Sequence, residues 1–343
     1  MNKKLLIPLA LLTLMACACA KKTVSTTGSD AQEYLQLWMD KNYPGVAANA
    51  NGIYILEDTP GNGEAWDKEK LYVYVEVTIQ GLGGTISATT DEELAKQLGT
   101  YQKGNYYGPK FQMMGDGISY AGVDAMLSGM KLGGHRKAVI PAWMLTTSRY
   151  DTQKEYVDAC TVSTSLIYDV TLLGQTDDPD EDAIATLKTY VQEHFGADIQ
   201  PVSYVADETA DGSFYFISDV SAFEGVDPLN SDVSVQMNYT GKLLDGTIFD
   251  TTLEKLAKDA GIYKSTNTYQ PVTMVYSTNY ENVLMGTSSS LINGFKGGVS
   301  QMKWKGQKAT VIFTSKHGYS SSGSGSTIPG FAPLIFELEF LTD

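Results

Sequence analysis

The stretch YTGKLLDGTIFD, residues 239–250, determines how the C-terminal half of the chain folds. Asp245-Gly246 is a dipeptide typical of a tight turn between two antiparallel strands. Such a turn brings Tyr239 on one strand close to Phe249 and Asp250 on the next. The stretch therefore predicts a hairpin that gathers two aromatic rings and one carboxylate.

Two further blocks follow this hairpin. Residues 291–302 (LINGFKGGVSQM) predict a short helix, and residues 328–341 (IPGFAPLIFELEFL), after Gly318-Tyr319, predict a loop and a final strand. In this order the three blocks resemble the FK506-binding protein (FKBP) family of peptidyl-prolyl cis–trans isomerases over most of residues 232–341. The resemblance implies a curled antiparallel sheet wrapped on one short helix, with an aromatic pocket between them.

The resemblance also implies roles for individual residues. Catalytic contacts are expected from Tyr239, Phe249, Asp250 and Tyr319, and substrate-binding contacts from Leu291, Ile292, Phe295, Ile328 and Phe336. Phe295 stands where the family usually has tryptophan, so the apolar platform is kept but the indole N–H donor is lost. For any single apolar position the alternative is a plain core role, and for Asp250 it is a surface role.

The implied reaction needs no nucleophile. Rotation about an X–Pro bond is slow because amide resonance opposes it with a barrier of ~18–20 kcal/mol. A dry aromatic pocket favours the twisted, less polar amide over the planar one. The histidines, His135, His194 and His317, show no metal-ligand spacing, so we predict no metal site and no cofactor.

The chain also repeats itself. Residues 31–43 and 183–195 both show helical apolar spacing, with Asp30 and Asp182 as candidate N-caps. Each is followed by an aromatic extended segment and an alternating strand. We therefore predict an α+β fold with two FKBP-like domains, each a curled antiparallel sheet around a short helix, each preceded by an amphipathic helix.

The first copy lacks the pocket residues. Ile79 is expected where Tyr239 stands, Ser87 and Ala88 replace Phe249 and Asp250, and Thr146 or Thr147 replaces Tyr319. We predict the fold without the activity, and a surface that binds clients, dimerises or acts as a spacer.

The second copy is longer than a minimal family member between Asp250 and Leu291. Residues 252–263 predict a helix, and residues 266–290 predict a flap with some strand near the pocket mouth.

The N-terminus is typical of a targeting segment. Lys3 and Lys4 precede a short apolar stretch that ends in Leu14-Met15-Ala16-Cys17, which resembles a bacterial lipobox with Cys17 as the lipidation site. The alternative is a secretory signal cleaved after Ala18 or Ala20. The predicted organisation is a lipoprotein signal peptide (1–16), a flexible tether (17–29), a degenerate FKBP-like domain (30–175), a linker (176–182) and an isomerase domain (183–343).

Charge and cysteine content limit the partners. With 25 basic against 40 acidic residues the net charge is −15, which argues against nucleic-acid binding. Cys19 and Cys160 predict either a disulfide or, preferably, a free buried thiol.

The function expected from these features is prolyl isomerisation of proline-containing polypeptide clients during folding of exported proteins. We expect the lipid to hold the enzyme at the bacterial cell envelope, on the periplasmic face of the outer membrane. The alternatives are a non-catalytic client-binding chaperone and an interaction scaffold.

Overall fold

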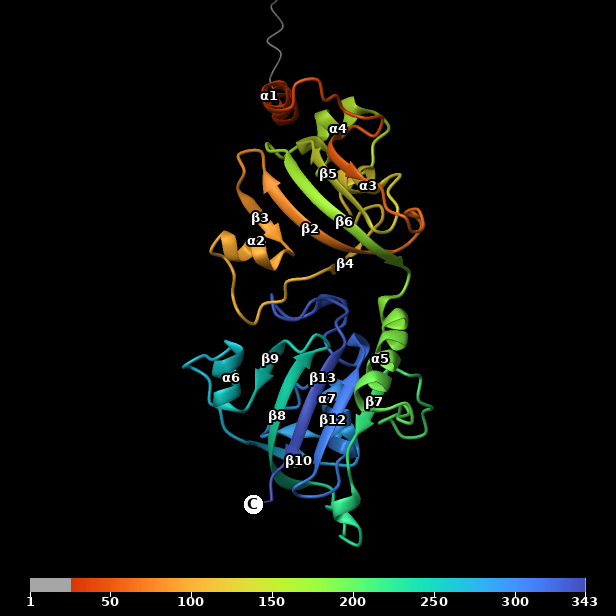
Figure 1. Ribbon diagram of the computed structural model, residues 1–343, viewed down its shortest axis with the longest axis vertical. Helices are drawn as coiled ribbons and strands as arrows, with labels where there is room; N and C mark the ends of the chain where they lie inside the picture. Colours follow the sequence, from red (N-terminus) through yellow and green to blue (C-terminus); the bar gives the residue numbers. More distant parts are fainter. Residues whose placement is uncertain (1–25, 343) are drawn as a thin grey trace, which may run out of the picture.

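The computed structural model describes residues 26–342, which form two domains stacked along the long axis of the molecule (Figure 1). Each domain has its own antiparallel sheet and its own core. The predicted signal peptide, Cys17 and Cys19 lie outside the described residues. Among the helices of residues 26–342, none has the length and apolar character needed to cross a bilayer.

The first domain is a six-stranded sheet with the order β1-β5-β6-β2-β3, and β4 pairs with another part of β2. Its strands are β1 (Tyr54–Thr59), β2 (Tyr72–Gly81), β3 (Ile86–Thr89), β4 (Lys110–Met113), β5 (Gly134–Ile140) and β6 (Leu166–Thr176). Its helices are α1 (Thr27–Asn42), α2 (Glu92–Gln97), α3 (Ala121–Leu127), α4 (Gln153–Ala159) and the 3₁₀ turn η1 (Ala142–Met144). Val123, Met126 and Leu127 of α3 are buried in the core that the sheet surrounds.

The second domain is a seven-stranded sheet with the order β11-β10-β8-β13-β12-β7, and β9 pairs with β8. Its strands are β7 (Phe214–Ile217), β8 (Val233–Leu243), β9 (Ile248–Thr251), β10 (Val272–Tyr276), β11 (Leu284–Met285), β12 (Lys308–Phe313) and β13 (Leu334–Phe340). Its helices are α5 (Pro179–Phe195), α6 (Glu254–Ala260), α7 (Asn293–Gln301) and the 3₁₀ turns η2 (Ser221–Phe223), η3 (Tyr280–Asn282), η4 (Ser315–His317) and η5 (Ser320–Ser322).

The two domains repeat the same order of elements, from α1 and α5 through the short helices α3 and α7 to the last strands β6 and β13. Within residues 26–342 all paired strands are antiparallel. The predicted α+β class with two similar domains is therefore confirmed.

Both long helices begin earlier than predicted. Helix α1 begins at Thr27 and Thr26 is its N-cap, because Thr26 and Ser29 form a reciprocal capping box. Residues 27–29 are thus helical and not part of a flexible tether. Helix α5 begins at Pro179, because the Asp178 carboxylate accepts hydrogen bonds from the backbone N–H groups of residues 180 and 181 at 3.0 and 3.2 Å. The linker predicted over residues 176–182 is mostly helix.

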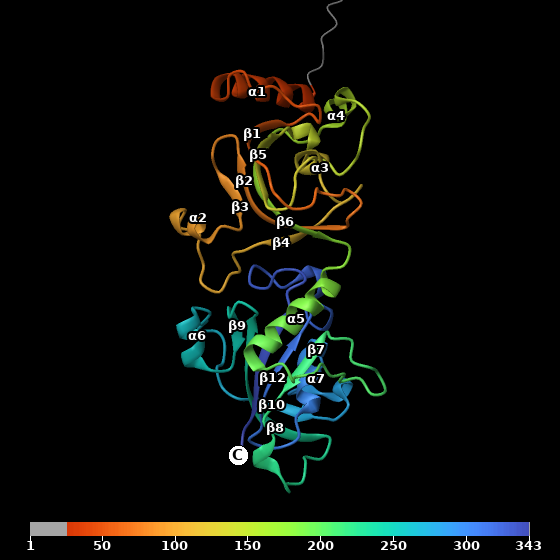
Figure 2. The same ribbon diagram turned by 45° about the vertical axis from the view of Figure 1, so that its right-hand side comes forward.

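Helix α5 covers the outer face of the second sheet, along which it runs in Figure 2. Its Leu187 and Val191 are fully buried against Ile312 and Ile335. The neighbours of Ile335 in the chain, Leu334 and Phe336, point into the core on the other face. Because both faces of β13 are covered, residues 334–336 form an unbroken apolar run instead of an alternating one.

The segment predicted as a flap, residues 266–290, is only partly a flap. Strand β10 within it pairs with β8, and Met274 and Tyr276 are fully buried. The first domain has the same arrangement, with β4 paired to β2 after α2. The additional residues therefore build an extra strand into each sheet, and in the second domain the alternating apolar side chains of β10 complete the core.

Cys160 is a free thiol that is half-buried instead of buried, and its Sγ lies 3.1 Å from the carbonyl oxygen of Val162.

The packing of α5 predicts a measurable loss of stability for Leu187→Ala. Removing this fully buried side chain leaves a cavity between helix and sheet, which costs about 2–5 kcal/mol. Urea unfolding of the second domain measures the change. The control Lys188→Ala, at an exposed side chain on the same helix, is expected within about 0.5 kcal/mol of wild type. Equal effects of the two substitutions would contradict the packing role of α5.

Candidate active site

The β8–β9 hairpin brings together the residues that its sequence pattern singled out. Gly241 lies opposite Asp250 in the register, and the hydroxyls of Thr240 and Thr251 are 2.9 Å apart. The Tyr239 hydroxyl donates a hydrogen bond of 2.8 Å to Oδ2 of Asp250. The phenol and the carboxylate therefore form one polar unit at the edge of an apolar surface.

Gly241 is needed because the ring of Phe249 lies directly on its backbone. A Cβ at position 241 would lie 2.5 Å from the Phe249 ring and 3.0 Å from the Phe336 ring. A side chain at this position would therefore push the Phe249 ring out of place.

Phe336 on β13 is the centre of the aromatic cluster. Its ring meets Phe295, Phe249 and Phe313 at centroid separations of 5.1, 5.6 and 5.9 Å, and Tyr239 at 6.4 Å. Phe295 also lies edge-on to Tyr239 at 5.4 Å. Edge-on contacts of this kind fix ring orientations and add to the energy of apolar burial.

Helix α7 supplies the floor of the cluster. A Cβ at Gly294 would lie 2.5 Å from the Phe313 ring, so the missing side chain lets the helix approach β12 closely. The next residue, Phe295, is only 3% exposed and faces the cluster. Phe313 was missed in the sequence analysis, although its place in an apolar strand was a signal for it.

The remaining predicted residues belong to the same apolar core. Ile328 is buried, and Leu291, Ile292 and Tyr319 are partly buried against it. All nine predicted catalytic and substrate-binding positions thus lie in or on one core.

The electrostatics keep both phenols protonated. Burial raises the pKa of Tyr239 well above its usual range, and the Asp250 carboxylate adds to this shift by its charge and its hydrogen bond. Burial also raises the pKa of Tyr319, and the charge of Asp250 adds to it. The two hydroxyls are therefore hydrogen-bond donors near one carboxylate.

A polar chain that the sequence analysis missed supports the turn just before Tyr319. His317 lies 2.8 Å from the Tyr204 hydroxyl through Nδ1 and 2.7 Å from Ser213 Oγ through Nε2. Ser213 in turn donates to the carboxylate of Asp211, which also accepts from Lys316 at 3.1 Å. Since the carboxylate only accepts, the chain is satisfied when His317 is neutral and donates from Nε2 to Ser213.

The pKa shifts in this chain agree with a neutral imidazole. Burial lowers the pKa of His317 below its usual value, and neighbouring Lys316 acts in the same direction. Burial alone would raise the pKa of Asp211, but the hydrogen bonds from Ser213 and the contact with Lys316 outweigh it and hold the pKa well below its usual range.

The first domain shows which residues replace the site. Thr78 and Thr89 form the same hydroxyl contact, at 2.8 Å, as Thr240 and Thr251. This register places Val77 where Tyr239 stands, so the predicted match of Ile79 with Tyr239 was wrong by two positions. The first domain therefore has no phenol at this position.

Three further replacements follow from the same register. Ile79 occupies the place of Gly241, so a branched side chain stands where the second domain has none. Ser87 occupies the place of Phe249, so a small side chain replaces the ring. Ala88 replaces Asp250 and removes the carboxylate.

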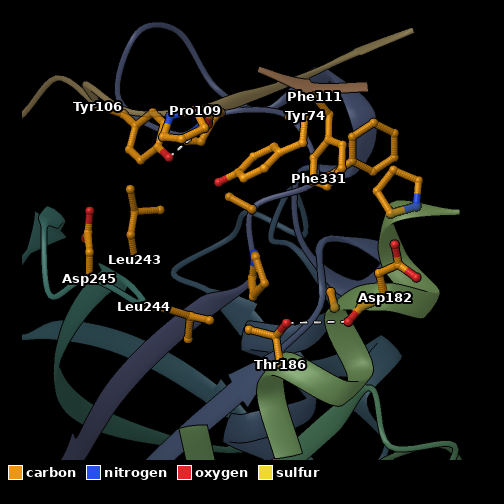
Figure 3. A pocket seen from close by; sticks show the side chains of 16 residues that line it. Tyr74, Tyr106, Pro109, Phe111, Asp182, Thr186, Leu243, Leu244, Asp245 and Phe331 are labelled. Carbon is orange, nitrogen blue, oxygen red and sulfur yellow. Dashed lines mark hydrogen bonds between the residues drawn. The ribbon is translucent and has the colours of Figure 1, made fainter. Parts of the chain in front are cut away.

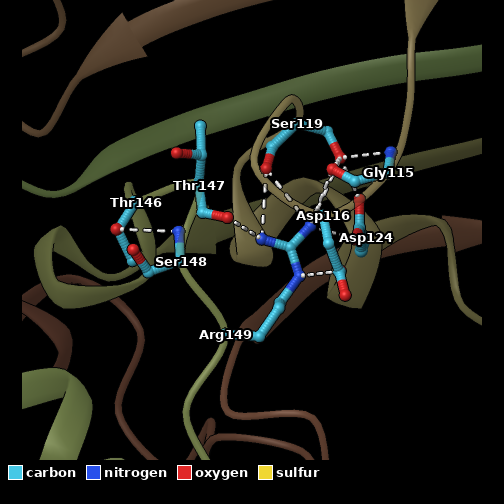
Figure 4. Close-up of polar contacts among 8 residues, drawn as sticks. All are labelled: Gly115, Asp116, Ser119, Asp124, Thr146, Thr147, Ser148 and Arg149. Carbon is cyan, nitrogen blue, oxygen red and sulfur yellow. Dashed lines mark hydrogen bonds and ion pairs between the residues drawn. The ribbon is translucent and has the colours of Figure 1, made fainter.

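Arg149 lies in the loop after β5, which corresponds to the loop with Tyr319 in the second domain, and Figure 4 shows the contacts of Arg149. Its guanidinium donates to the carbonyl oxygens of Thr147 and Ser119 at 2.9 and 3.2 Å and pairs with Asp116 and Asp124. These contacts tie the loop after β5 to the segment that leads into α3. Thr146 follows η1 at the place where Tyr319 follows η4.

Comparison with known proteins identifies the family. The family model described as FKBP-type peptidyl-prolyl cis-trans isomerase matches residues 226–341. An FK506-binding protein of Neisseria meningitidis serogroup C is 32% identical over 107 residues, which are 31% of this chain and 76% of that protein. FK506-binding protein 1A of Aspergillus fumigatus is 32% identical over 117 residues, which are 34% of this chain and 83% of that protein.

A solved peptidyl-prolyl cis-trans isomerase from Pseudomonas syringae pv. tomato is 24% identical, with coverage of 49% of this chain and 97% of that chain and a TM-score of 0.28. With a TM-score this low, family membership rests on the sequence relatives. The chain belongs to the FKBP-type peptidyl-prolyl cis–trans isomerases, and its second domain carries the isomerase sequence.

The neutral state of His317 predicts how stability depends on pH. Because its folded pKa lies below the usual value, the unfolded chain binds more protons as the pH falls, and the free energy of unfolding decreases as the pH falls through the unfolded value of about 6.5 towards the lower folded pKa. The depressed pKa of Asp211 acts only at lower pH, below its usual value. Urea titrations of the second domain at several pH values measure the slope. His317→Gln is expected to flatten it, and an unchanged slope in this variant would rule out His317 as its source.

Proposed function

We propose that Tyr239, Phe249, Asp250, Phe295, Tyr319 and Phe336 carry out the isomerisation, on exported proteins that fold at the bacterial cell envelope. The single observation that supports the site best is the Tyr239–Asp250 hydrogen bond at the edge of the aromatic cluster. It places a fixed polar unit where an apolar surface begins.

The aromatic cluster suits the proline ring. Phe295 forms a buried platform, and Phe249 and Phe336 stand edge-on to one another as walls. An apolar surrounding stabilises the twisted amide relative to the planar one, since twisting reduces resonance and charge separation. Each 1.36 kcal/mol of this difference raises the rate about tenfold.

The polar groups orient the substrate. The protonated hydroxyl of Tyr319 donates to a carbonyl oxygen of the client next to the proline. Asp250 holds the Tyr239 hydroxyl and faces the amide region, where it favours one orientation of the twisted carbonyl. No proton is transferred, because isomerisation breaks and forms no covalent bond.

The location is supported by the sequence at the N-terminus. The tetrapeptide Leu14-Met15-Ala16-Cys17 after a short apolar stretch supports lipid attachment to the sulfur of Cys17. Two or more acyl chains hold a protein firmly on a bilayer, because each buried CH₂ adds about 0.8 kcal/mol. The enzyme would then act on polypeptides that emerge at the periplasmic face of the outer membrane.

Cis-to-trans conversion of a short X–Pro peptide by the purified full chain tests the catalytic roles. Tyr319→Phe removes one hydrogen bond, which is worth about 0.5–1.5 kcal/mol and lowers kcat/KM about three- to tenfold. The double variant Asp250→Ala, Tyr319→Phe is expected to lose nearly all acceleration. The second domain then lacks both polar groups, and the first domain has neither group to replace them.

Tyr190→Phe, on the outer helix α5, is the matched control and is expected to keep wild-type kcat/KM. A well-folded wild-type chain that gives no acceleration would contradict catalysis on small peptides and favour the client-binding chaperone. Full activity in the double variant would contradict these residue roles.

Cys17→Ala tests the anchor. Expressed in a bacterium with lipoprotein processing, the wild-type chain is expected in the membrane fraction with lipid on Cys17, measured by mass spectrometry of the N-terminal peptide. The variant is expected in the soluble fraction. An unmodified Cys17 in a cleaved chain would instead support the plain secretory signal.

A further inference from the structure

The segment from Ser315 to Phe331, here called the Tyr319 loop, carries Tyr319 and Ile328. Its own structure consists of the turns η4 and η5, a bridge between Ser324 and Ile328, and a hydrogen bond from the Phe331 N–H to the Ser320 carbonyl oxygen. Residues 320–326 are serine and glycine only, a composition that is flexible in isolation. Two non-glycine residues, Ser320 and Phe331, have positive φ values of 52° and 62°. Such residues keep this conformation only where the surroundings impose it.

The loop supplies part of those surroundings by the Phe331–Ser320 hydrogen bond, and the first domain supplies another part. The ring of Phe331 lies edge-on to Tyr72 at 5.0 Å and to Phe111 at 5.7 Å, two residues from neighbouring strands of the first sheet. Figure 3 shows Phe331 beside Phe111. An aromatic side chain of the loop is therefore fixed by the sheet of the other domain.

The middle of the loop is held by the first domain as well. The backbone N–H of Tyr106 donates to the carbonyl oxygen of Ser326 at 2.9 Å, and the Ser326 hydroxyl donates to Oδ1 of Asn105 at 2.8 Å. Ser326 lies between Tyr319 and Ile328 in the chain, so its two hydrogen bonds to the first domain limit how far the loop can move.

The start of the loop is fixed by the helix that joins the domains. The carboxylate of Asp180, in the first turn of α5, accepts from Ser315 Oγ at 2.8 Å and from the N–H of Lys316 at 3.1 Å. The loop is thus held at its beginning, middle and end by groups outside it.

Next to the Phe331 contact, the domains do not fill the space between them. A cavity of about 340 Å³ lies there, lined by Tyr74, Tyr106 and Phe111 of the first domain, by the start of α5 and by the end of the loop (Figure 3). The space between the sheets is therefore bridged by particular side chains, of which Phe331 is one, and these fix the loop.

We propose that the first domain is a positioning element for the isomerase site: Tyr72 and Phe111 hold Phe331, and through it they hold Tyr319 and Ile328 in place for the client. The inference rests on the proposed role of Tyr319 in the site. It gives the domain that lacks the pocket residues a part in the reaction, although none of its residues is a catalytic residue.

The test compares the full wild-type chain with the double variant Tyr72→Ala, Phe111→Ala. The variant is expected to show faster amide hydrogen exchange in residues 319–331 and a kcat/KM for X–Pro isomerisation about tenfold lower, because a mobile Tyr319 is rarely in the productive geometry. Tyr72→Phe keeps the ring and is expected to keep wild-type exchange and rate. The matched control Tyr150→Ala breaks another edge-on pair of the first domain, with Tyr156 at 5.0 Å, and is expected to change neither.

Unchanged exchange of residues 319–331 in the double variant would overturn the proposal, and so would faster exchange with an unchanged rate. Amide exchange does not depend on catalysis, so it tests the contact even if the wild-type chain does not isomerise the peptide. A wild-type chain that does not isomerise the peptide would count against the proposed function and not against the contact. If the double variant unfolds its first domain in a thermal melt, Phe331→Ala makes the same comparison and leaves the cores of both domains intact.

Discussion

The ring of Phe336 joins the hairpin, the short helix and the last strands of the second domain, and the aromatic cluster of the site is arranged around it. It lies on the last strand, between the hairpin that carries Phe249 and Tyr239 and the helix that carries Phe295. Strand β13 can carry this ring inward because α5 covers Ile335 on its other face. The helix at the domain boundary and the aromatic site are therefore parts of one packing arrangement, in which a displaced strand would disturb both.

The same framework without the site shows what the site requires beyond the fold. The first domain keeps the threonine pair of the hairpin, the short helix and the strand order, but has Val77, Ser87 and Ala88 at the three hairpin positions. Arg149 ties down the loop after β5, whereas the corresponding loop after β12 in the second domain is rich in serine and glycine. The fold and the site residues separate here within one chain.

The sequence predicted the fold class, and the nine residues predicted for the site lie in or on one core, because three motif blocks and an internal repeat restrict the fold strongly. The sequence pattern matched Ile79 instead of Val77 with Tyr239 because strand side chains alternate with a period of two, so a shift by two residues leaves the pattern unchanged. The helix starts at Thr27 and Pro179 were missed because several acidic and hydroxyl residues there could serve as caps. The Phe331 ring is held by residues of another domain, and no local sequence pattern predicts such contacts.

The exchange of Gly241 and Phe249 for Ile79 and Ser87 also has an evolutionary consequence. A ring at position 87 beside the branched Ile79 would overlap with it, as a Cβ at Gly241 would overlap with Phe249. A single mutation at either position thus gives a clash or an empty space, and only both together restore the surface. Conversion of one surface into the other by stepwise mutation therefore passes through a poorly packed intermediate.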